Sequence, residues 1–87
     1  MSIAICPGSF DPMTLGHLNI VRRTSHIFDR VIVVIMVNAS KRSPMFTIEE
    51  RVDMARRVTA RFENVTVDTY DGRSAEYARR YEGTVLV

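Results

Sequence analysis

The residues best suited to phosphate chemistry lie in one short segment, Pro7-Gly8-Ser9-Phe10-Asp11-Pro12-Met13-Thr14-Leu15-Gly16-His17. An apolar stretch, residues 3–6, precedes this segment, and an amphipathic run, residues 18–28, follows it. This order predicts a strand, a glycine-containing loop and a helix, an arrangement that presents backbone N–H groups and a helix N-terminus to a phosphate. His17 would lie at the start of the helix, where an imidazole nitrogen can donate to a phosphoryl oxygen.

A second polar segment begins 23 residues after His17 and reads Ser40-Lys41-Arg42-Ser43-Pro44-Met45-Phe46-Thr47-Ile48-Glu49-Glu50-Arg51. Lys41 is the only lysine among twelve basic residues. A compact ammonium at this point favours phosphate binding, and a solvated loop residue is the alternative. Thr47 and Glu50 have capping-box spacing, which predicts a helix that begins directly after Thr47.

The first segment resembles the (T/H)xGH signature of the nucleotidyltransferase superfamily, whose members attack the α-phosphate of a nucleotide and release pyrophosphate. Together, the two segments resemble the bacterial phosphopantetheine adenylyltransferase family. The likeness runs from Ile3 to Val87. The resemblance implies adenylyl transfer from ATP to 4′-phosphopantetheine, which yields dephospho-coenzyme A and pyrophosphate.

The resemblance also implies roles for five residues. His17 would contact ATP and stabilise the transition state as the catalytic residue. Ser9 would lie between the two substrates, with the backbone amide of Phe10 also donating to ATP. Lys41 would hold the phosphate of phosphopantetheine, and Ser74 would contact the pantetheine arm. Mg²⁺ would arrive with ATP and take no ligand from the protein.

Two places depart from the family pattern. The chain reads Gly72-Arg73-Ser74 where the family usually has apolar residues, so Ser74 could instead simply begin a helix. Ser43 is an extra residue between Arg42 and Pro44, and it could alter how Lys41 is presented. Asp11 could be taken for a metal ligand or a base, but its position before a proline favours a carboxylate that orders the loop.

The periodicity predicts an α/β chain of the order β-α-β-α-β-α-β. Strands are expected at residues 3–6, 31–37, 65–67 and 84–87, and helices at residues 16–28, 48–62 and 75–81. Short connections of this kind predict a Rossmann-like, doubly wound parallel sheet with right-handed crossovers. The strand near residue 84 should flank the first strand on the side opposite the second. The loops that carry Ser9, Lys41 and Ser74 should then meet at the carboxyl ends of the strands.

Composition limits the other possibilities. Eighty-seven residues form at most one small domain. The formal net charge is only +2 and the arginines are scattered along the chain, which does not support nucleic-acid binding. The longest apolar run, Val31 to Val37, is far too short to cross a membrane. One cysteine, Cys6, fits a reducing cytoplasm and is expected to be a small strand residue.

The resemblance further implies that residues 1–87 are the amino-terminal portion of a single nucleotidyltransferase domain. An Arg-Gly-Leu-Arg segment and a later serine-rich loop of the family do not occur here, so part of the ATP site is expected to be missing. A homo-hexamer is the implied assembly. Two alternatives stay open: another nucleotidyltransferase, acting on a cytidine nucleotide or on nicotinamide mononucleotide, and a non-catalytic phosphate-binding or assembly fragment.

Overall fold

The structure is a computed structural model, and it describes residues 2–37, 46–71 and 84–86. Its elements follow the order β1 (Ile3–Gly8), α1 (Leu15–Ile27), β2 (Arg30–Met36), α2 (Ile48–Thr59), β3 (Val65–Tyr70) and β4 (Thr84–Leu86). The four strands form one sheet in the order β3-β2-β1-β4, and every neighbouring pair is parallel. The predicted α/β class and the predicted place of the last strand beside the first are therefore confirmed.

Strand lengths differ from the prediction because pairing extends beyond the apolar letters. β1 continues to Gly8, which pairs with Ile35, and β3 continues to Tyr70, which pairs with Met36. The local sequence loses its strand pattern earlier, whereas the long central strand β2 offers ladder partners on both sides. The third helix expected at residues 75–81 lies outside the described residues.

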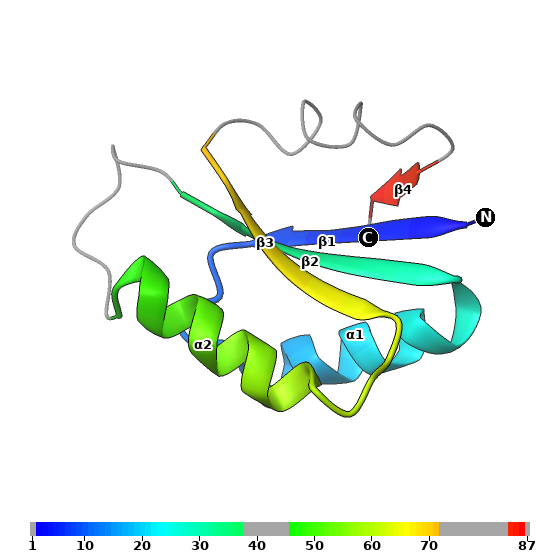
Figure 1. Cartoon of the computed structure of the whole chain (residues 1–87), viewed down its shortest axis with the longest axis horizontal. Coiled ribbons are helices and arrows are strands. Elements are labelled where there is room, and N and C mark those ends of the chain that lie inside the picture. The colour runs from blue at the N-terminus through cyan, green and yellow to red at the C-terminus, as the bar shows by residue number, and fades with distance from the viewer. Residues whose placement is uncertain (1, 38–45, 72–83, 87) are drawn as a thin grey trace.

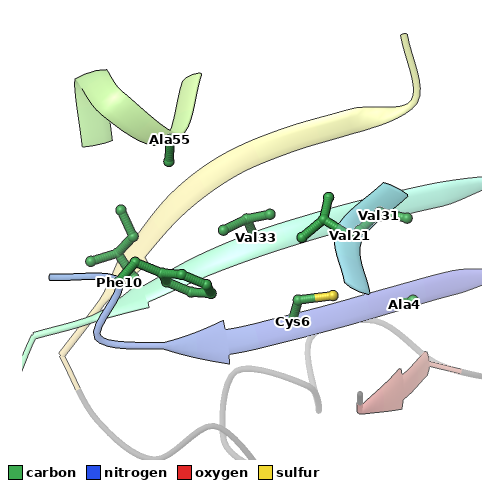
Figure 2. Packing of buried hydrophobic residues seen from close by; sticks show 8 residues of the cluster. Ala4, Cys6, Phe10, Val21, Val31, Val33 and Ala55 are labelled. Atoms are coloured by element: carbon green, nitrogen blue, oxygen red, sulfur yellow. The ribbon is translucent and has the colours of Figure 1, made fainter. Parts of the chain in front are cut away.

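The two described helices lie against the same face of the sheet, α1 across β2 and α2 across β2 and β3 (Figure 1). The core on this face joins Val21 of α1 and Ala55 of α2 to alternate residues of the central strands, Ala4, Cys6, Val31, Val33 and Ile35 (Figure 2). The other set of strand residues, Ile5, Ile32 and Val34, is also buried. The central strands are thus buried on both faces, as the continuous apolar run predicted.

Each of the two described helices begins with a capping box. In α2, Thr47 Oγ1 accepts from the Glu50 N–H at 3.1 Å, while Glu50 Oε1 accepts from the Thr47 N–H at 2.9 Å. This confirms the predicted helix start. Within the described residues, no helix is long and apolar enough to span a membrane.

Candidate phosphate-binding site at the end of β1

The loop that follows β1 is anchored by an aromatic side chain. Phe10 has φ 46°, a left-handed conformation that is uncommon for a residue with a side chain, and only 5% of its surface is exposed. Figure 2 shows its ring turned into the core beside Cys6 and Val33. Burial of this ring compensates for the unfavourable backbone conformation, so Phe10 holds the loop in one shape.

Gly8 is required by that ring. A Cβ atom placed on Gly8 would lie 3.1 Å from Cε2 and 3.2 Å from Cζ of Phe10, closer than a methyl group and a ring normally approach. The absence of a side chain at Gly8 therefore lets the Phe10 ring close over the end of β1. The Gly-Ser-Phe order of the motif has a packing reason in addition to any reason in phosphate binding.

His17 is the third residue of α1, so it lies in the first turn of a helix that begins one residue before the predicted start at Gly16. Thr14 is the N-cap: its Oγ1 accepts from the His17 N–H at 3.3 Å, and Nδ1 of His17 accepts from the Thr14 N–H at 3.1 Å. Because a backbone N–H can only donate, Nδ1 must be unprotonated, and the proton of the neutral ring lies on Nε2. The imidazole thus takes the place that Glu or Gln takes in the usual capping box.

The Phe10 ring supports the imidazole from a second side. The two ring centroids are 5.0 Å apart and the planes are inclined at 72°, an edge-to-face contact. The core thus holds Phe10, and Phe10 together with Thr14 holds His17. His17 itself is half-buried.

The start of α1 is open and suited to an anion. Thr14, Leu15 and Gly16 are exposed, with Leu15 at 84%, and no acidic residue lies in the first turn. The first N–H groups of a helix have no partner within it and carry partial positive charge. These N–H groups and the imidazole are donors, which suit phosphate oxygens better than a metal ion. That this site binds an anion stays a prediction.

Two long-range hydrogen bonds join the loop to the start of α2. Oδ1 of Asp11 accepts from the Phe46 N–H at 2.8 Å, and Nη1 of Arg51 donates to the Ser9 carbonyl at 3.0 Å. The first bond agrees with the interpretation of Asp11 as a carboxylate that orders the loop. Sequence reasoning missed the second.

A signal for Arg51 was nevertheless present in the sequence. It lies three residues after Ile48 and four before Ala55, so it shares the inward face of α2, and it is 7% exposed.

The structure brings Ser9, Phe10 and His17 together around one loop, with Ser9 exposed directly after the end of β1. Lys41 and Ser74, the other two residues with predicted roles, lie outside the described residues, as do Ser43 and the Gly72-Arg73 pair. In the part of the chain that the structure describes, no three His, Cys, Asp or Glu residues gather to hold a metal ion.

Cys6 does not belong to the chemistry of the site. It is buried in β1, and desolvation by burial raises the pKa of its thiol to about 11. The thiol is therefore protonated at neutral pH and is a poor nucleophile, consistent with its interpretation as a small strand residue.

Comparison with known proteins identifies the class. Residues 5–87 match the cytidylyltransferase-like family, and the chain belongs to this family. It is 47% identical to the phosphopantetheine adenylyltransferase of Synechocystis sp. and 42% identical to that of Caldanaerobacter subterraneus, over 98% and 100% of this chain. These alignments cover 53% and 54% of the two relatives, so the chain spans about half their length.

The fold has solved counterparts. The Plasmodium falciparum nicotinic acid mononucleotide adenylyltransferase complexed with NaAD superposes with a TM-score of 0.69 over 98% of this chain and 49% of its own. Its sequence identity to this chain is 18%, so the similarity concerns the fold alone. The predicted Rossmann-like architecture is thereby confirmed.

Proposed function

We propose that this chain carries the phosphate-binding half of an enzyme that transfers the adenylyl group of ATP to 4′-phosphopantetheine. The observation that carries the proposal is the orientation of His17, whose Nδ1 is engaged by Thr14 so that Nε2 holds the proton. The substrate pair is supported by the whole-chain similarity to two phosphopantetheine adenylyltransferases.

The proposed reaction needs donors and no base. An anionic oxygen of the 4′-phosphate attacks the α-phosphorus of ATP, a new P–O bond forms, and the bond to the bridging oxygen breaks with release of pyrophosphate. No proton has to leave the nucleophile, and negative charge develops on the α-phosphate oxygens. Nε2–H of His17 would donate to that charge, and such a donor acts mainly in the transition state.

The remaining roles are positional. Ser9, exposed directly after β1, and the Phe10 amide would donate to phosphate oxygens between the two substrates, beside the open first turn of α1. Lys41 would hold the phosphate of phosphopantetheine, and Ser74 would contact its arm. Mg²⁺ would be carried by the ATP phosphates and would neutralise charge on the leaving pyrophosphate.

A chimera tests the proposal, because the chain spans half the length of its relatives. In it, this chain replaces the matching residues of the Synechocystis enzyme, and pyrophosphate release is measured with three pairs of nucleotide and acceptor, two of them with ATP and one with CTP. Phosphopantetheine is expected to be adenylylated; nicotinamide mononucleotide and a phosphocholine acceptor offered with CTP are not. Turnover of either of these instead would favour the other nucleotidyltransferases. A folded chimera with no turnover would favour a non-catalytic phosphate-binding fragment.

A further inference from the structure

Arg51 is a buried cation with a single described acceptor. Its side chain lies between α2 and the loop after β1, it is 7% exposed, and Nη1 donates to the carbonyl of Ser9, 42 residues away. Its Nε is buried without a hydrogen-bond partner in the described part of the chain. A buried guanidinium with an unpaired donor is a poor source of stability, and an apolar side chain at such a position is often equally stable or better.

The carbonyl that Arg51 binds belongs to the peptide whose N–H is that of Phe10. The Asp11-Pro12 bond is the only cis peptide in the described residues, so the Ser9-Phe10 peptide is trans. In a planar trans peptide the C=O and N–H bonds point in opposite directions. Since the Ser9 carbonyl points at Arg51, the Phe10 N–H points away from α2.

We propose that Arg51 is a positioning residue that fixes the Ser9-Phe10 peptide so that the Phe10 N–H faces the anion at the loop; this inference rests on the proposed function. A peptide turned the other way would present a carbonyl oxygen to the phosphate and repel it. The charge-assisted bond to the carbonyl also polarises the peptide, which strengthens its N–H as a donor.

Contacts other than that of Arg51 restrict rotation of the Ser9-Phe10 peptide only in part. The buried ring fixes the Phe10 side chain, and the Asp11 bond to Phe46 fixes the chain beyond it. Neither contact engages the Ser9 carbonyl itself. Among the described contacts, the guanidinium of Arg51 is the group that selects between the two orientations of the peptide.

The test uses the ¹⁵N-labelled chain, inorganic tripolyphosphate as the probe, and two observables. Residual dipolar couplings report the direction of the Phe10 N–H vector without any ligand. Titration with tripolyphosphate gives the affinity and the shift of the Phe10 amide. The variants are Arg51→Met, which keeps the length without donors, Arg51→Lys, which keeps one cationic donor, and Arg57→Met, which removes an equal charge from an exposed residue of the same helix.

In Arg51→Met, the residual dipolar coupling of the Phe10 N–H is expected to differ from its wild-type value, while the couplings of α1 stay unchanged. The affinity should fall at least about tenfold, the size expected for a lost charge-assisted donor, and the Phe10 amide should cease to shift. Arg51→Lys should recover part of both effects, and Arg57→Met should stay within about twofold of the wild type.

Two results would overturn the inference. One is an unchanged Phe10 coupling in Arg51→Met. The other is a loss of affinity no greater than that of Arg57→Met. If Arg51→Met does not fold, Arg51→Lys provides the test. Its coupling and affinity are expected to be intermediate, and wild-type values in Arg51→Lys would count against the inference. If the wild-type chain does not bind tripolyphosphate, the proposed anion site is refuted. The Phe10 coupling measured without ligand still tests whether Arg51 orients the peptide.

Discussion

Nδ1 of His17 accepts a hydrogen bond from the backbone N–H of Thr14 at 3.1 Å, and this bond decides which nitrogen of the ring carries the proton. A neutral imidazole that could otherwise carry its proton on either nitrogen is thereby prepared to donate through Nε2. The same bond completes the capping box of α1, so one contact both stabilises the start of the helix and sets the tautomer of the imidazole.

Replacement of His17 by Ala in the chimera should lower the rate by about 100- to 1,000-fold, because a donor aimed at developing charge is lost. The affinity for ATP should change far less. His17→Gln separates catalysis from capping, since Gln can still accept from the Thr14 N–H. The free energy of unfolding of His17→Gln should therefore exceed that of His17→Ala, whereas its catalytic rate should remain low. Steady-state kinetics and urea unfolding measure the two effects, and an unchanged rate in His17→Ala would refute the catalytic role.

Gly8→Ala should destabilise the chain by about 1–3 kcal/mol, the usual cost of overpacking, because the new methyl group would meet the Phe10 ring at 3.1 Å. Gly16→Ala is the matched control. Its Cβ would have Thr14 Oγ1 at 3.6 Å as its nearest neighbour, an ordinary contact, and alanine favours a helix by about 0.5–1 kcal/mol. Urea unfolding should therefore move in opposite directions for the two variants. Equal destabilisation would contradict the packing argument.

The stability of the chain should fall in alkaline solution because of Cys6. The folded pKa of this thiol is about 11, against an ordinary value of 9.0, so the folded state keeps a proton that the unfolded state loses. The contribution of the neutral thiol is fully present below pH 9 and is lost as the pH rises toward 11. Comparison of urea unfolding at several pH values with Cys6→Ala isolates the effect. The free energy of unfolding of Cys6→Ala should not show this decrease between pH 9 and pH 11.

Lys41→Ala in the chimera should chiefly raise the KM for phosphopantetheine and leave kcat nearly unchanged. A phosphate away from the reacting bond carries similar charge in the bound substrate and in the transition state. Removal of Lys41 should therefore weaken the binding of both states equally. Lys41→Arg keeps the charge and should recover most of the affinity. A fall in kcat as large as that of His17→Ala would instead place Lys41 at the reacting phosphate.

Much of the fold was determined by local sequence. The continuous apolar residues from Val31 to Ile35 form a strand buried on both faces because neither face of such a strand can meet water. Thr47 begins α2 because its side chain and that of Glu50 satisfy each other's backbone N–H groups, a contact within one turn. The placement of His17 at the start of α1 followed from the same kind of short-range pattern.

Only the tertiary structure decided how the site is held. The contact of Arg51 with Ser9 joins residues 42 apart, and the bond between Asp11 and Phe46 spans 35. Periodicity could place Arg51 on the inward face of α2, but it could not say what the guanidinium would meet there. That partner depends on how α2 packs against the end of β1, which is set by the parallel sheet as a whole rather than by any neighbour in the sequence.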